Sequence, residues 1–234
     1  GTSFISGVFG MAGGMILMGV LLAFMPVASA MVLHGVVQMT SNGWRALLWR
    51  RNTDYKIFFR YMVGMLLACA VFTFVGFLPD RALVLIGLGV IPFLFVITPE
   101  KFVPQADRPF GAEISGFLNT ALQFVAGVSG PLLDIFFVRS YMDRRAVVAT
   151  KAACQTITHF AKLIYFLNIG RLVGGFELDV WVMAMAVIMA IAGTSISKIV
   201  LDRLTDTQFR RWTRWIVMSV GFVYLGQGAF TYLH

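Results

Sequence analysis

Charged residues are scarce in this chain. They make up 13% of its 234 residues, whereas 59% of the residues are hydrophobic, and the mean hydropathy is +0.82. A soluble domain of this length carries more charge and does not need so much apolar sequence. Apolar runs recur along the chain and approach or exceed the roughly 20 residues of a helix that crosses a bilayer. The composition therefore excludes an ordinary soluble domain and predicts an all-α, polytopic integral membrane protein.

The chain also lacks the groups that catalytic and metal sites use. No Ser/His/Asp grouping, phosphate loop or zinc signature is present. The two cysteines, Cys69 and Cys154, lie in separate apolar segments, so a disulfide framework is not indicated. His34 and His159 are far apart in the sequence with few carboxylates or thiols nearby, which makes a weak set of metal ligands. We therefore expect no enzyme, no metal site and no cofactor.

Positive charge is in excess, with a formal net charge of +8. The basic residues gather in short segments between the apolar runs, at 50–56, 139–145 and 201–214. The positive-inside rule accounts for this pattern without nucleic acid as a partner. We expect a multi-pass protein of the cell (inner) membrane whose basic loops face the cytoplasm.

Six uninterrupted spans and two broken elements are expected. Each glycine weakens a helix by about 1 kcal/mol, and a broken membrane helix is tolerated where its backbone lines a cavity. Glycines interrupt the apolar stretch 4–24 at 10–14 and the stretch 110–138 at 127–131. The expected spans cover residues 29–49, 58–77, 82–97, 146–166, 181–200 and 215–233.

The broken elements divide the chain into matching halves, 1–97 and 110–234, which a proline-containing linker joins at 98–109. A basic loop follows the span 29–49 in the first half but precedes the span 146–166 in the second. If both loops are cytoplasmic, these two spans run in opposite directions. We therefore predict two inverted repeats, each a broken or re-entrant helix pair followed by three spanning helices. Two parallel repeats that violate the charge rule are the alternative.

Two of the expected spans carry matching polar stripes. The residues of each stripe are spaced i, i+4, i+8 and i+11, which places them on one helix face, and the second stripe follows the first by 117 positions. Exposing such a face to lipid is costly, so each stripe should face a cavity or a partner helix. The stripes are His34, Gln38, Asn42 and Arg45, and Lys151, Gln155, His159 and Lys162.

The glycine breaks are candidate anion sites. Half-helix N-termini present unpaired N–H groups and a partial positive charge, which suits an anion. Gly13, Gly14, Ser129 and Gly130 would let the backbone approach such a ligand closely. Close packing of helices through small residues is the alternative.

The expected depth of the stripe residues suggests their roles in binding. Gln38 and Gln155 fall near the midplane, where their amides can donate hydrogen bonds to an anion. Asn42 and His159 occupy the next turn. Lys151, with His159, would supply positive potential.

The remaining charged residues of these segments have two interpretations each. Arg45 and Lys162 are expected near helix ends, where snorkelling to the membrane interface explains them at least as well as a site. Asp134 could carry a proton or pair with a cation, or it could form a surface ion pair with Arg139. The candidates for proton coupling are His34, His159 and Asp134.

Three motifs give the chain a family resemblance. They are FISGVFGMAGG at 4–14, GVSGP at 127–131 and TKAACQ at 150–155. With these motifs in a duplicated arrangement, the chain resembles the sulfite exporter TauE/SafE family, also called TSUP transporters, over nearly its whole length. The resemblance implies transport, often outward, of sulfur-containing or small organic anions such as sulfite, thiosulfate or sulfoacetate. It also implies that the glycine breaks and the facing polar residues form the anion path.

The sequence therefore favours a secondary transporter that exports a small sulfur-containing anion, bound at the midplane between the two broken helices. The anion and the lipid bilayer are its expected partners, while a proton as coupling ion and a homodimer stay open. An uncoupled anion channel or facilitator and a non-transporting membrane scaffold are the alternatives.

Overall fold

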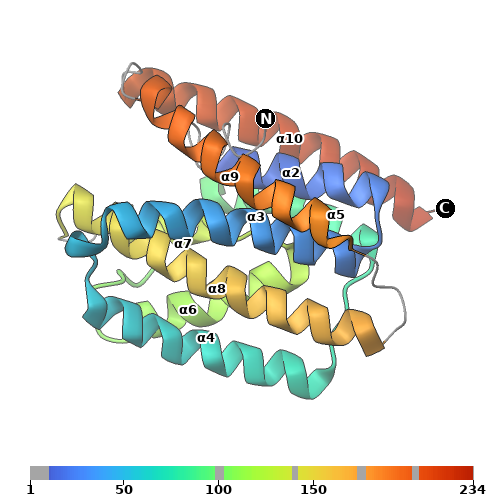
Figure 1. Ribbon diagram of the computed structural model, residues 1–234, viewed down its shortest axis with the longest axis horizontal. Helices are drawn as coiled ribbons and strands as arrows, with labels where there is room; N and C mark the ends of the chain where they lie inside the picture. Colours follow the sequence, from blue (N-terminus) through green and yellow to red (C-terminus); the bar gives the residue numbers. More distant parts are fainter. Residues whose placement is uncertain (1–10, 98–102, 139–141, 173–177, 202–205, 234) are drawn as a thin grey trace.

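The computed structural model describes residues 11–97, 103–138, 142–172, 178–201 and 206–233. All regular structure in this part of the chain is helical, which confirms the predicted all-α class. Figure 1 shows the long helices side by side in one bundle. The elements are α2 (Met11–Phe24), α3 (Val27–Leu48), the 3-10 helix η1 (Arg50–Asn52), α4 (Tyr55–Val75), α5 (Arg81–Ile97), α6 (Gly111–Ala126), α7 (Gly130–Val138), α8 (Arg144–Leu172), α9 (Val180–Leu201) and α10 (Asp206–Leu233).

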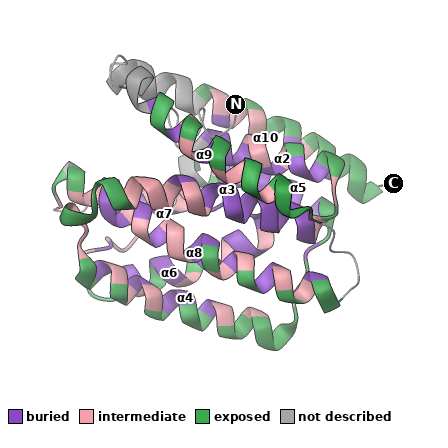
Figure 2. Ribbon diagram, viewed as in Figure 1, coloured by how far each residue is buried: buried purple, intermediate pink, exposed green. Residues whose placement is uncertain are grey.

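Within the described part of the chain, three helical segments are long and apolar enough to cross a bilayer, and all three lie on the outside of the bundle. They are Tyr55–Val75, Val180–Ser197 and Trp215–Leu233, of which 28%, 17% and 22% of the residues are buried. Figure 2 shows exposed residues along α4, α9 and α10, whereas much of α3 is buried. Large apolar side chains such as Phe74 and Trp181 are exposed there. Apolar faces of this size fit lipid, so the chain is an integral membrane protein.

The break that the sequence predicts at residues 10–14 is wrong for residues 11–14, which are helical. Gly13 and Gly14 lie inside α2, which runs without interruption from Met11 to Phe24. The helix accommodates these glycines because tertiary packing outweighs a propensity cost of about 1 kcal/mol each. Gly14 also has no room for a side chain, since a Cβ there would overlap the amide of Gln38. The first ten residues, which include the rest of the predicted break, lie outside the described part of the chain.

The predicted basic loop at 201–214 is also too long. Residues 202–205 are not described, and α10 already begins at Asp206. The amphipathic segment that follows is therefore the polar first part of the last helix, continuous with the apolar part that the sequence predicts from 215 onward. In the predicted linker, residues 98–102 lie outside the described part, and 103–110 form turns.

The break in the second half is present where it was predicted. Helix α6 ends at Ala126 and α7 begins at Gly130. Gly127 between them has a φ of 78°, a left-handed conformation that glycine adopts without strain. It has no room for a side chain, because the sulfur atoms of Met18 and Met31 lie 3.0 Å from the position of a Cβ.

Helices α6 and α7 form a re-entrant hairpin. The backbone N–H of Ala106, which precedes α6, donates to the carbonyl of Phe136 near the end of α7 at 2.9 Å, so the hairpin starts and ends at the same end of the bundle. Helix α8 begins at this end too, because Thr150 accepts a 2.9 Å hydrogen bond from the N–H of Asp54 between α3 and α4. The hairpin therefore enters the protein and returns, as predicted for a re-entrant pair.

Helices α3 and α8, which carry the two polar stripes, pack against each other in opposite directions. Gly35, early in α3, lies against Lys162, and Gly43, further along α3, lies against Thr156, which comes earlier in α8. Corresponding spans of the two halves are thus antiparallel, as an inverted duplication requires. Helices α5 and α10 are also antiparallel, since Gly228 lies against Ile86.

Two further kinds of contact repeat under exchange of the two halves. Helix α4 packs on α8 as α9 packs on α3, and α2 packs on α10 as α7 packs on α5. Each half contributes three consecutive long helices to this scheme, α3 to α5 and α8 to α10. The arrangement is the one predicted for two inverted repeats, while the domain boundaries 1–97 and 110–234 stay a prediction.

The two ends of the bundle differ in charge. The end where α3 stops and α4, α6 and α8 start carries Arg50, Arg51, Lys56, Arg108 and Arg145 among its described residues. We call it the basic end. Because the hairpin is re-entrant, described basic residues of both halves lie at this one end, in agreement with the positive-inside rule.

Replacement of Gly64 by alanine should destabilise the bundle. A Cβ at Gly64 would collide with the backbone of Glu113, and one at Gly116 with the backbone of Tyr61, so α4 and α6 touch through their main chains. We expect Gly64→Ala to lower the free energy of unfolding by about 1–3 kcal/mol. Thermal unfolding of the purified protein, followed by tryptophan fluorescence, measures the change.

Gly226→Ala in α10 is the matched control, because no atom lies within 4 Å of a Cβ built there. Alanine should leave that helix at least as stable as glycine does. Equal melting temperatures for Gly64→Ala, Gly226→Ala and the wild type would contradict the close contact between α4 and α6.

Candidate functional site

A cluster of buried polar side chains lies where α2, α3, α8 and the tip of the α6–α7 hairpin meet. At its centre, Nζ of Lys162 donates hydrogen bonds to Nδ1 of His34 at 2.8 Å and to the carbonyl of Gly127 at 2.9 Å. Nε2 of His34 lies 3.1 Å from the carbonyl of Gly14. Four elements from both halves are therefore joined by two side chains. We call these groups, together with the amides described below, the central cluster.

Lys162 is the dominant charge of the central cluster. Its exposed fraction is 0%, and none of the described carboxylates forms an ion pair with it. The partial negative charge of the carbonyl end of α6, at Gly127, offsets part of the cost of burying this charge. An ammonium group has three donors, and the described residues accept from two of them. One donor of the ammonium group is thus left without a partner among the described residues.

The hydrogen bonds of His34 assign its tautomer. Nε2 faces a carbonyl, which can only accept, so this nitrogen carries the proton and Nδ1 is left to accept from Lys162. The ring of His159 lies beside it, with ring centroids 5.6 Å apart. Nδ1 of His159 is buried and has no hydrogen-bond partner among the described residues. Next to the ring of His34 there is therefore a second imidazole nitrogen that is unpaired among the described residues.

Amide side chains from α6, α8 and α3 extend the cluster. Nε2 of Gln123 lies 3.0 Å from Oγ of Ser129 and 3.3 Å from Oε1 of Gln155, while Oε1 of Gln123 is buried without a partner. On the other side, the amide of Gln38 lies against Gly14. Amide oxygen and nitrogen atoms can exchange places by rotation, so these groups can turn donors toward a ligand.

The structure brings together most of the residues that the sequence predicts for the site. Gly14, His34, Gln38 and His159 lie at the junction of α2, α3 and α8, and Gln155 contacts the hairpin through Gln123. The predicted hairpin residues Ser129 and Gly130 are at its tip, where Ser129 is buried and Gly130 begins α7. Gly13 is buried next to Gly14.

Two predicted residues lie apart from this group. Lys151 forms an ion pair with Asp134 of α7, and both side chains are partly exposed. This pair is one of the alternatives that the sequence leaves open for Asp134; Arg139, the other, lies outside the described residues. Asn42 donates to the carbonyl of Gln38 in its own helix at 2.9 Å.

Lys162 and Gln123 belong to the central cluster but are not among the site residues that the sequence predicts. The interpretation of Lys162 as an interfacial residue near a helix end is wrong, because α8 continues to Leu172 and the hairpin tip covers this lysine. Gln123 lies one helical turn before Gly127. Its backbone carbonyl accepts a 2.9 Å hydrogen bond from the N–H of Gly127. The sequence signal for Gln123 is its position, as a polar residue one helical turn before the predicted break.

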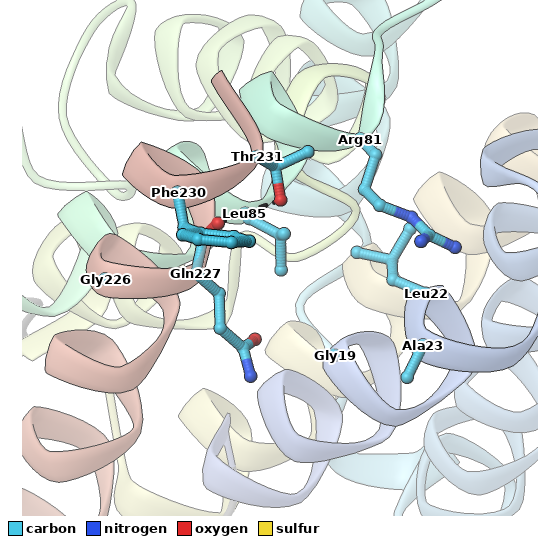
Figure 3. Close-up of a pocket in the computed structure, with 9 residues that line it drawn as sticks. All are labelled: Gly19, Leu22, Ala23, Arg81, Leu85, Gly226, Gln227, Phe230 and Thr231. Carbon is cyan, nitrogen blue, oxygen red and sulfur yellow. Dashed lines mark hydrogen bonds between the residues drawn. The ribbon is translucent and has the colours of Figure 1, made fainter. Parts of the chain in front are cut away.

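A cavity of about 350 Å³ lies away from the central cluster, between α2, α5 and α10 at the end opposite the basic end (Figure 3). Its walls include Gly19 of α2, Arg81 and Leu85 of α5, and Gln227 and Thr231 of α10. The central cluster itself is closed, since His34 and Lys162 are fully buried.

Comparison with known proteins gives one match. The family model described as Sulfite exporter TauE/SafE matches residues 1–224. No curated protein and no solved structure matches the chain.

The contact between Lys162 and His34 predicts energetic coupling in a double-mutant cycle. With His34→Leu and Lys162→Met, each single variant breaks the same hydrogen bond, so the double variant should lose less stability than the sum. We expect a coupling energy of about 0.5–3 kcal/mol, the range for residues in direct contact. Denaturant unfolding of the four proteins in detergent measures it.

The control cycle combines His34→Leu with Lys56→Met, an exposed lysine at the basic end. These two changes should add within about 0.5 kcal/mol. Additive behaviour of His34→Leu and Lys162→Met as well would contradict the contact.

Proposed function

Because the chain belongs to the sulfite exporter TauE/SafE family, whose members are membrane transporters rather than enzymes, we propose that it exports a small sulfur-containing anion such as sulfite or sulfoacetate. The single observation that supports this proposal best is the buried Lys162, which has no carboxylate partner among the described residues. An uncompensated buried cation is expensive, and a bound anion would offset that cost.

The substrate would bind in the central cluster, between the hairpin tip and α2. Lys162 supplies the charge in this proposal, in place of Lys151, whose charge Asp134 already compensates. Gln38 and Gln155 donate hydrogen bonds from the two related helices, one in each half. A sulfonate or sulfite presents three oxygen acceptors, which matches several donors around one cation.

The backbone of α2 and of the hairpin tip would complete the site. Gly13 and Gly14 let α2 approach the ligand closely, and Ser129 and Gly130 present the N-terminal end of α7, where the helix dipole favours an anion. The two imidazoles, His34 and His159, lie beside the site and are the candidates for carrying a coupling proton. Asn42 and Asp134 would then serve to hold their helices in place.

Inverted symmetry provides a route to alternating access. In this scheme the site lies on the contact between α3 and α8, and rocking of one half against the other opens it first to one face and then to the other. By the positive-inside rule, the basic end would face the cytoplasm, with the protein in the cell (inner) membrane. Export then runs from the basic end to the end that carries Arg81.

Binding of a sulfur anion should raise the melting temperature of the wild type and not that of Lys162→Met. A ligand that binds only the folded state stabilises it by RT ln(1 + [L]/Kd), about 2.7 kcal/mol at one hundred times Kd. The test uses sulfite, thiosulfate and sulfoacetate, with sulfate, acetate and chloride for comparison. Lys56→Met, an exposed charge removed at the basic end, should keep the full shift.

The same panel separates the proposal from its rivals. A shift that survives Lys162→Met but disappears in Lys151→Met would move the cation site to Lys151. No shift in any well-folded sample would contradict anion binding and favour a scaffold in which Lys162 only fixes the hairpin.

Transport itself is tested by counterflow in proteoliposomes. Vesicles loaded with unlabelled sulfoacetate should transiently accumulate labelled sulfoacetate above the outside concentration when they contain the wild type. Lys162→Met should reduce the initial rate by about tenfold or more, because the anion loses the cation of the central cluster. Equilibration without accumulation would instead indicate an uncoupled channel.

A further inference from the structure

The cavity between α2, α5 and α10 lies on the side of the protein from which the proposed substrate would leave. Arg81 and Leu85 come from the first turns of α5, and Gln227 and Thr231 come from the last turns of α10. In Figure 3, Gln227 and Arg81 project from opposite walls, with Gly19 of α2 between them. A volume of about 350 Å³ falls within the usual range of small-ligand sites.

Arg81 gives this cavity a positive charge at an end of the protein that has little of it. Among the described residues, the basic side chains at this end are Arg81 and Arg171, whereas the other end carries many. The guanidinium of Arg81 makes a long hydrogen bond of 3.4 Å to the carbonyl of Met25. The neighbouring carboxylate, Asp80, accepts from the N–H of Leu83 at 2.7 Å and caps α5. The donors of Arg81 are thus largely available for a ligand.

A short barrier separates this cavity from the central cluster. Gly19 in the cavity wall and Gly14 in the central cluster are five residues apart on α2, about 7.5 Å along the helix. Tyr224 lies between them. Its hydroxyl donates to the carbonyl of Met15 at 2.9 Å, and its ring lies so close to Gly19 that a Cβ there would overlap it.

We propose that this cavity is a second anion site, an outer vestibule in which Arg81, with Gln227 and Thr231, binds the sulfonate or sulfur oxoanion next to the central cluster. The inference rests on the proposed function. Tyr224 separates the two sites. In this structure the outer vestibule is therefore formed, while the central cluster is closed. Movement of α10 relative to α2 would connect the outer vestibule with the central cluster.

The test is equilibrium exchange of sulfoacetate in vesicles of phosphatidylcholine alone, with Arg81→Gln and the control Arg171→Gln. Arg171 is exposed at the same end but does not line the cavity. We expect Arg81→Gln to raise KM about fivefold with an unchanged maximal rate, because it removes one exposed charge contact. Arg171→Gln should match the wild type, and Arg81→Lys should recover most of the loss.

Three results would overturn the vestibule. One is equal KM values for Arg81→Gln and Arg171→Gln, with both melting temperatures as in the wild type. Another is a fall in maximal rate alone, which points to a structural role for Arg81. The third is an effect that appears only when phosphatidylglycerol is added, which assigns the cavity to a lipid headgroup. Absence of exchange by the wild type would instead contradict the proposed function, so the two failures are distinguishable.

Discussion

The hydrogen bonds of Lys162 hold the central part of this protein together. One joins α8 to α3 through His34, and another fixes the tip of the re-entrant hairpin through the carbonyl of Gly127. The hairpin carbonyl is free for this contact because Gly127 ends α6 in a left-handed conformation. The same ammonium group is a buried charge that lacks a carboxylate among the described residues, so one residue serves both the fold and the proposed binding of an anion.

The inverted architecture explains how so short a chain can place a cluster of polar groups deep inside a membrane protein. A re-entrant hairpin brings backbone and polar side chains into the protein without a lipid-exposed break, because the surrounding spans cover it. The apolar surfaces of α4, α9 and α10 face outward, whereas α3 and α8 place their polar stripes against each other. The described basic residues of both halves then lie mostly at one end, whereas Arg81 and Arg171 are the described basic residues at the other.

Much of this arrangement could be predicted from local patterns. The apolar runs predicted the spans, and the stripes predicted which faces of α3 and α8 turn inward, because both signals depend on helical periodicity alone. The depth of a residue could not be predicted in the same way. Lys162 was placed near a helix end because the length of α8 and the cover of the hairpin are tertiary properties. Gly13 and Gly14 predict a break, because the contact between Gly14 and Gln38 that holds them in a helix is not visible in the sequence.

The central claim is that a sulfur anion binds beside Lys162. The most direct measurement is the location of a heavy-atom ligand, with crystals grown in 2-bromoethanesulfonate and the bromine found by anomalous diffraction. The account predicts a bromine peak in the central cluster, next to Nζ of Lys162 and between Gln38 and Gln155. A structure with bromine peaks only elsewhere, although the compound raises the melting temperature of the same protein, would contradict it.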